Sequence, residues 1–274
     1  MEFRTIVDIP EPGFLIRPFE DMLFVGSCFA DSIGRRFQEE QFRVTVNPYG
    51  VMYNPASILH TIERLAACAT LDLQSVKTAF LTLGTNHVYR LKETGEIVDN
   101  CQKRPQSLFT EEELSVDECA DYLQKTVDLL RQMNPDIHVV LTVSPIRYRK
   151  YGYHGSQLSK ATLLLAVDHV CANPCQSVSY FPAYEIVNDE LRDYRFYASD
   201  MLHPSQQAVD YIWERLVDTF FSQRAKTFLE EWRPLKQNLG HKPFDPDSDA
   251  YKALMDKTML KIEELREKYP NFAL

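Results

Sequence analysis

The chain has 274 residues, of which 45% are hydrophobic, enough for one large domain or two small ones with a buried core. It carries 39 acidic against 30 basic side chains, for a formal net charge of −9 at pH 7, so we expect no nucleic-acid partner. No apolar run is long enough to span a bilayer, and residues 1–8 lack a basic segment followed by an apolar one. We therefore expect a cytoplasmic protein with no signal peptide and no membrane span.

Apolar runs alternate with amphipathic segments along most of the chain. The pattern predicts strands over residues 22–26, 42–46, 80–83, 87–91, 96–100, 137–143 and 177–181. It predicts helices over residues 30–41, 54–69, 115–133, 156–171 and 206–221. Ser115 and Glu118 have the spacing of a capping box, and Thr94-Gly95 predicts a hairpin between its two flanking strands. This order predicts an α/β fold with three α/β/α layers and a mostly parallel sheet.

The character of the chain changes after residue 222. Helices are predicted over residues 225–232 and 251–268, with Pro234, Gly240 and Pro243 between them, and no strand is predicted there. We therefore expect one domain over residues 1–222. Residues 223–274 are expected to form a helical C-terminal extension that packs on or near the core.

Two short motifs far apart in sequence carry the chemistry. The first predicted strand ends in Gly26-Ser27, which places a serine on a turn at the carboxyl edge of the sheet. Asp200 and His203 lie close enough for the carboxylate to hold one ring nitrogen while the other faces the serine. Pro204 suits the first turn of the next helix. The set predicts acyl transfer, with Ser27 as nucleophile, His203 as general base and Asp200 as its orienter.

Each of these residues also has a plainer interpretation. Ser27 has the residue type of a helix N-cap, Asp200 that of a cap or turn residue, and His203 that of a surface loop histidine. The cysteines, at positions 28, 68, 101, 119, 171 and 175, show no C-x-x-C pair and no zinc-ligand spacing. We expect free buried thiols, Cys28 among them, and neither a structural metal nor a cofactor.

The sequence resembles the GSCFA-domain proteins, because residues 26–30 read GSCFA and further similar stretches occur at residues 46–55, 142–147, 157–161 and 192–197. The resemblance extends over about residues 20–222. These proteins in turn resemble the SGNH/GDSL esterase superfamily. In that superfamily a serine, a glycine, an asparagine and a late Asp-x-x-His form four ordered blocks. Here Gly-Ser-Cys replaces the usual Gly-Asp-Ser order in the first block.

The resemblance implies an oxyanion hole made of the backbone N–H groups of Ser27 and Gly50 and the side chain of Asn86. Gly50 and Asn86 also fit a turn glycine and a residue that begins a hairpin, and Asn54 is the alternative donor. Arg147, after the most strongly predicted strand, is a weaker candidate for substrate binding; the alternative is a solvated loop residue.

The sequence therefore predicts a serine-dependent esterase that hydrolyses a small acyl ester, with an O-acetylated carbohydrate as one candidate substrate. An acyltransferase with the same Ser-His-Asp triad and a non-catalytic binding module on the same fold are the alternatives. The substrate, the acyl length, the oligomeric state and the role of the C-terminal helices stay open.

Overall fold

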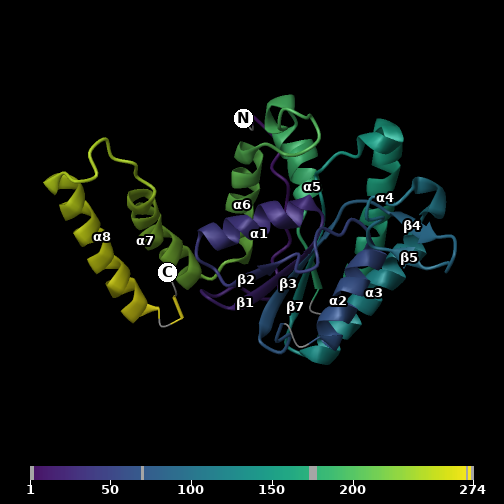
Figure 1. The fold of residues 1–274 in the computed structure, drawn as a ribbon, viewed down its shortest axis with the longest axis horizontal. Helices are drawn as coiled ribbons and strands as arrows, with labels where there is room; N and C mark the ends of the chain where they lie inside the picture. Colours follow the sequence, from purple (N-terminus) through teal and green to yellow (C-terminus); the bar gives the residue numbers. More distant parts are fainter. Residues whose placement is uncertain (1–2, 69–70, 173–177, 270, 273–274) are drawn as a thin grey trace.

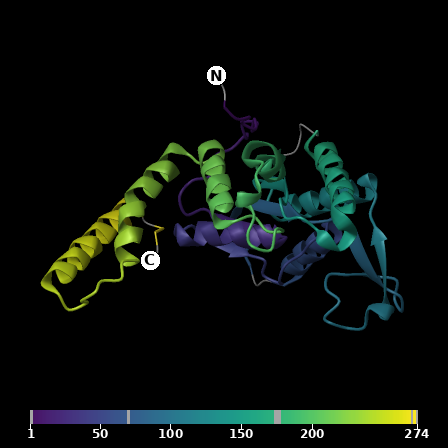
Figure 2. The ribbon, with the colours of Figure 1, turned by 90° about the horizontal axis from the view of Figure 1, so that it is seen from above.

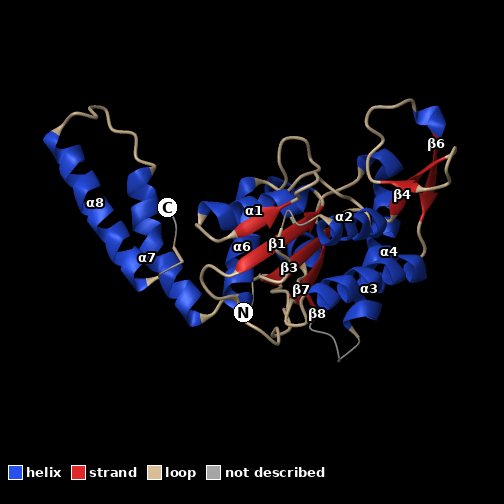
Figure 3. Ribbon diagram, turned by 60° about the horizontal axis from the view of Figure 1, so that its bottom comes forward, coloured by secondary structure: helices blue, strands red, loops and turns tan. Residues whose placement is uncertain are grey.

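A parallel sheet forms the centre of the computed structural model, which describes residues 3–68, 71–172, 178–269 and 271–272. Its strands are β1 (Asp21–Gly26), β2 (Val44–Val46), β3 (Val76–Leu83), β7 (His138–Val143) and β8 (Val178–Tyr180), in the order β2-β1-β3-β7-β8 (Figures 1 and 3). All neighbouring pairs run parallel. The mostly parallel sheet predicted from the sequence is confirmed, although β3 begins earlier and β2 later than expected.

Helices cover both faces of this sheet (Figures 1 and 2). Residues of α1 (Cys28–Glu39) and α6 (Gln206–Phe220) share one hydrophobic cluster with one face. Residues of α2 (Pro55–Ala67), α3 (Val116–Met133) and α4 (Gly152–Cys171) share a second cluster with the other face. The three-layer α/β/α architecture is therefore confirmed, and so is the capping box at the start of α3.

The side chains of β1 explain why this strand is apolar from Met22 to Val25. Phe24 stacks on Phe80 of β3 with ring centroids 4.6 Å apart and belongs to the first cluster. Leu23 and Val25 point to the opposite face and belong to the second cluster. A strand buried on both faces has no alternation of polar and apolar residues, and it ends here with Gly26 at the carboxyl edge.

A small antiparallel sheet is formed by β4 (His87–Leu91), β5 (Ile97–Val98) and β6 (Phe109–Glu113), in the order β5-β4-β6. The hairpin of β4 and β5 is confirmed. Strand β6 was not predicted, because it contains three successive glutamates. It follows a short 3₁₀ turn, η1 (Gln106–Leu108).

Short turns connect the large elements near the predicted site. They are η2 (Arg149–Tyr151), α5 (Ala183–Glu185), the π-helical η3 (Ile186–Leu191) and η4 (Tyr194–Phe196). In the described part of the chain, no helix is both long and apolar enough to cross a membrane.

The C-terminal extension consists of α7 (Gln223–Leu239) and α8 (Asp249–Lys268), which lie side by side at one end of the molecule (Figures 1 and 2). The predicted end of the first of these helices at residue 232 was wrong, since α7 continues through Pro234. Phe228 and Trp232 of α7 belong to the same hydrophobic cluster as Phe19. This extension is therefore in direct contact with the core, and the boundary at residue 222 stays a prediction.

Candidate active site

The turn between β1 and α1 is built around Gly26 and Ser27. Gly26 has φ +144°, and a Cβ there would lie 2.1 Å from the carbonyl oxygen of Thr82, so only glycine fits. Ser27 caps α1, since its Oγ accepts the N–H of Phe29 at 3.2 Å. Its Oγ also lies 3.0 Å from Oγ1 of Thr82, and its side chain is buried, with 2% exposure. The hydroxyl thus already has two partners inside the protein.

Cys28 is more accessible than Ser27, and the expectation of a buried thiol at this position was wrong. It is the first residue of α1 and is half-buried, because Phe29 and Ala30 take the core-facing positions of that turn. Its Sγ lies 3.6 Å from the hydroxyl of Tyr53. Of the other described cysteines, only Cys119 is buried; Cys175 lies outside the described residues.

Asp200 and His203 form a close pair in the loop before α6. Asp200 Oδ2 lies 2.6 Å from Nδ1 of His203, while Oδ1 accepts the backbone N–H groups of His203 and Leu202 at 3.0 and 2.9 Å. These bonds, the one from the His203 backbone first, lower the pKa of Asp200 to about 2. The ionised carboxylate therefore holds a proton on Nδ1 and leaves Nε2 as an acceptor. Nε2 has no hydrogen-bond partner among the described residues, and the His203 side chain is 45% exposed.

This loop is fixed to the carboxyl end of β7. Arg147, four residues beyond that strand, donates its backbone N–H to Leu202 at 3.0 Å and its Nη1 to the carbonyl of Met201 at 3.2 Å. Because β1, β3 and β7 are adjacent and parallel, the turn at Ser27 and the loop at His203 belong to the same edge of the sheet. In the structure as described, no hydrogen bond joins Ser27 to His203.

Aromatic side chains pack beside the turn at Ser27 and Cys28. The ring of Tyr53 meets that of Tyr148 edge to face, with centroids 5.9 Å apart, and Tyr148 stacks over Tyr151 at 5.7 Å. Burial raises the pKa of Tyr53 to about 12. These tyrosines were not predicted as site residues, since tyrosines in an aromatic-rich chain are read first as core.

The three predicted oxyanion donors are engaged elsewhere. The N–H of Ser27 donates to the carbonyl of Thr82 at 3.0 Å, and the N–H of Gly50 donates to Asn47 at 2.8 Å. The side-chain amide of Asn86 donates to the carbonyl of Leu114 at 2.7 Å. The structure thus does not bring these donors together at one open point, and the predicted oxyanion hole of Ser27, Gly50 and Asn86 stays a prediction.

Asn54, the alternative donor, has a different environment. It is 6% exposed, and its Oδ1 caps α2 by accepting the N–H of Ser57 at 2.9 Å. Its Nδ2 has no hydrogen-bond partner within the described ranges. It follows Tyr53, whose carbonyl accepts the N–H groups of Gly84 and Thr85. Asn54 therefore has an uncommitted donor close to the β1–α1 turn.

Arg147 lines a cavity of about 250 Å³ beside the histidine loop, together with Gln157, Tyr194 and Tyr197. Its guanidinium lies 4.1 Å from the ring centroid of Tyr153 and 5.3 Å from that of Tyr197. The residue thus supports the loop and borders a cavity, and its role in substrate binding stays a prediction.

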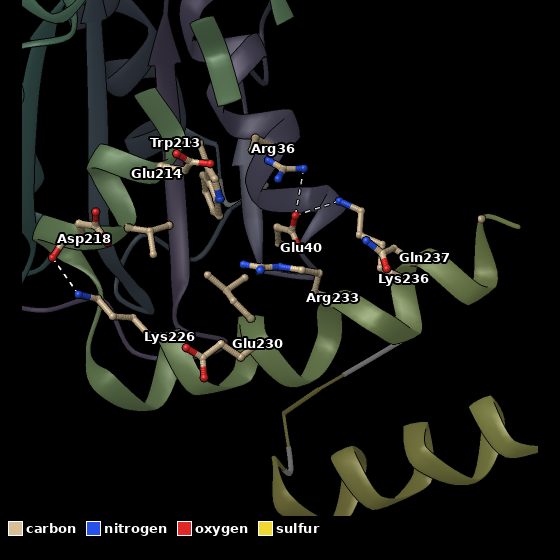
Figure 4. Close-up of a pocket in the computed structure, with 13 residues that line it drawn as sticks. Arg36, Glu40, Trp213, Glu214, Asp218, Lys226, Glu230, Arg233, Lys236 and Gln237 are labelled. Carbon is tan, nitrogen blue, oxygen red and sulfur yellow. Dashed lines mark hydrogen bonds and ion pairs between the residues drawn. The ribbon is translucent and has the colours of Figure 1, made fainter. Parts of the chain in front are cut away.

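A cavity of about 810 Å³ lies between α1, α6 and α7, on a different part of the molecule (Figure 4). In it Glu40 pairs with Arg36 at 3.0 Å and with Lys236 at 2.9 Å. None of the residues predicted for the active site lines this cavity. Its ion pairs connect the C-terminal extension to α1, and we assign them a structural role.

Comparisons with known proteins define the family. The sequence matches the GSCFA family over residues 21–78 and 66–216, and the C-terminal domain of GSCFA domain proteins over residues 232–274. The chain therefore belongs to the GSCFA family. No match is found among curated proteins.

Solved structures similar to this chain have low sequence identity to it. A member of the lipolytic protein G-D-S-L family from Veillonella parvula is 14% identical, with a TM-score of 0.48 over 73% of this chain and 97% of that one. A carbohydrate esterase family 3 protein from Talaromyces cellulolyticus is 9% identical, with a TM-score of 0.42 over 77% of this chain and 98% of that one. A family two carbohydrate esterase from Clostridium thermocellum, in complex with cellohexaose, is 11% identical, with a TM-score of 0.44 over 78% of this chain and 66% of that one.

Proposed function

We propose that this protein hydrolyses small acyl esters by nucleophilic catalysis at the β1–α1 turn, with Ser27 as nucleophile, His203 as general base and Asp200 as its orienter. The observation that carries the proposal is the 2.6 Å contact between Asp200 and Nδ1 of His203, which leaves Nε2 without a partner in the described part of the chain. A polarised imidazole at the sheet edge that also holds a helix-capping serine is suited to acyl transfer.

The chemical steps follow from these positions. The Ser27 hydroxyl leaves Thr82, gives its proton to Nε2 of His203 and attacks the ester carbonyl, with Asp200 stabilising the imidazolium. The leaving alcohol takes that proton as the acyl group remains on the serine oxygen. Water then attacks the acyl-enzyme, His203 again accepts and returns a proton, and the carboxylic acid departs.

The oxyanion of each tetrahedral intermediate needs hydrogen-bond donors. We propose the side-chain amide of Asn54 as one of them, because its Nδ2 has no partner among the described residues, whereas that of Asn86 donates to a carbonyl. The N–H groups of Ser27 and Gly50 serve this purpose only if the turn rearranges when substrate binds.

Cys28 is a second candidate nucleophile, and its exposure favours it. The thiol is half-buried where the Ser27 hydroxyl is buried, and it belongs to the first residue of α1. With Cys28 the acyl group would be carried as a thioester and the Ser27 hydroxyl would remain a helix cap. The Asp200–His203 pair would serve as base in the same way.

The experiment measures turnover of short p-nitrophenyl acyl esters and acetylated sugars by the wild-type protein and three variants. Ser27→Ala and His203→Ala are expected to abolish turnover, while Cys28→Ser retains it. If Cys28→Ser loses turnover and Ser27→Ala retains it, the nucleophile is Cys28 and not Ser27. Turnover that is slow with water but fast with an added sugar alcohol would favour an acyltransferase, and no turnover by any form would favour a binding module.

A further inference from the structure

Lys160, within α4, is a buried lysine without a carboxylate partner. Its side chain is 2% exposed, and its Nζ donates to the carbonyl oxygen of Gly84 at 2.6 Å. In the part of the chain that the structure describes, it forms no ion pair. Burial lowers the pKa of Lys160 to about 7. Buried amines are costly unless paired, so the position of this one calls for an explanation.

The carbonyl that Lys160 holds belongs to the wall of the candidate active site. A Cβ on Gly84 would lie 3.4 Å from Cβ of Ser27 and 3.0 Å from the carbonyl oxygen of Tyr53, so Gly84 packs directly against the catalytic turn. The N–H groups of Gly84 and Thr85 both donate to that same carbonyl of Tyr53. One residue, Gly84, thus separates the ammonium group from Ser27.

Ser159, the neighbour of Lys160, holds the same segment. Its Oγ lies 3.0 Å from Oγ1 of Thr85 and accepts the N–H of Asn86 at 3.1 Å. Two consecutive residues of α4 therefore secure residues 84–86 from one side, while Tyr53 secures them from the other. Both belong to the stretch 157–161, which the catalytic steps above do not use.

We propose that Lys160 is a positioning residue: through the hydrogen bond that it donates to the Gly84 carbonyl, it holds residues 84–86 against the nucleophile turn. This role rests on the proposed acyl-ester hydrolysis. Preorganised donors and charges act on a transition state without reorganising, so loosening this wall affects turnover more than substrate binding.

The test compares Lys160→Met, which removes the amine donor at similar side-chain length, with Lys160→Arg, which keeps an N–H donor. Lys125→Met, at an exposed position of α3, is the matched control. With a short p-nitrophenyl ester we expect kcat of Lys160→Met to fall by about ten- to a hundredfold, while KM changes by less than about threefold. Lys160→Arg is expected to recover most of this loss, and Lys125→Met to behave as wild type.

A second readout separates positioning from general support of the fold. Amide hydrogen exchange at residues 84–86 is expected to be at least about tenfold faster in Lys160→Met, with the melting temperature at pH 7 not below that of wild type. Unchanged exchange, or kcat within about twofold of wild type in an enzyme whose turnover requires His203, would overturn this inference alone. Wild-type protein without turnover dependent on His203 would overturn the proposed function and this inference with it.

Discussion

Replacing Lys160 with methionine should make the protein more stable at pH 7 and less stable at pH 10. Burial lowers the pKa of Lys160 from 10.5 to about 7. That gap corresponds to about 5 kcal/mol of lost stability at neutral pH, at 1.36 kcal/mol for each pH unit. Methionine removes this cost but leaves the Gly84 carbonyl without its donor, which costs about 1–3 kcal/mol. The net expectation at pH 7 is a gain of about 2–4 kcal/mol.

The difference in stability between wild type and Lys160→Met should depend on pH. Between pH 7 and 10.5 the unfolded chain binds the lysine proton and the folded protein largely does not, so wild-type stability rises with pH over this range. The methionine variant lacks this contribution. Its advantage should therefore shrink above pH 7 and reverse near pH 10, where the lost hydrogen bond outweighs what remains of the cost of burial.

Urea unfolding, followed by the fluorescence of the buried Trp213 and Trp232, measures the free energy of unfolding at both pH values. Lys125→Met is the control, since the substitution of an exposed lysine should give a difference from wild type that does not change with pH. A Lys160→Met variant that is less stable than wild type at pH 7, by an amount that pH does not alter, would refute the reasoning about the buried amine.

Four further substitutions test the site and its turn. Asn54→Asp keeps the helix-capping oxygen but removes the donors, so kcat should fall about ten- to a thousandfold with little change in the urea midpoint, and unchanged kcat would exclude this donor. Asn86→Asp should instead cost about 1–3 kcal/mol in urea unfolding and leave kcat within about threefold, because its amide bonds a backbone carbonyl; a large loss of kcat would restore it as a donor. Asp200→Asn should lower kcat by about 10²–10⁴ without unfolding the loop, and wild-type kcat would contradict its role. Gly26→Ala should cost at least about 3 kcal/mol by the same unfolding assay, because its Cβ would lie 2.1 Å from a carbonyl oxygen of β3; a stability equal to wild type would show that the turn can adapt.

The fold could be predicted from local patterns because its strands are buried on both faces. Residues 137–143 are apolar at five of seven positions, and their strand lies inside the sheet. Strand β6 could not be predicted in this way, since its three glutamates lie on a small sheet and none of them is buried. The continuation of α7 through Pro234 was missed because proline usually ends a helix, whereas here the flanking Trp232 and Leu235 pack in the core.

The site was predictable only in part, because its details depend on contacts between distant segments. The pairing of Asp200 with His203 is local and follows from their spacing. The partner of the Ser27 hydroxyl is Thr82, which depends on the register of β1 against β3. The burial of Lys160 had no signal in the sequence, since a lysine in a helix is usually exposed.

The most direct test of the central claim is a trapped acyl-enzyme. The protein is mixed with a short p-nitrophenyl ester, quenched in acid within milliseconds to seconds, and the peptide that contains residues 26–30 is sequenced by mass spectrometry. We predict one acyl group on Ser27, absent in His203→Ala; an acyl group on Cys28 would keep the mechanism and change its nucleophile. A protein that hydrolyses the ester with no acyl group in this peptide, or with the acyl group retained in His203→Ala, would contradict the account.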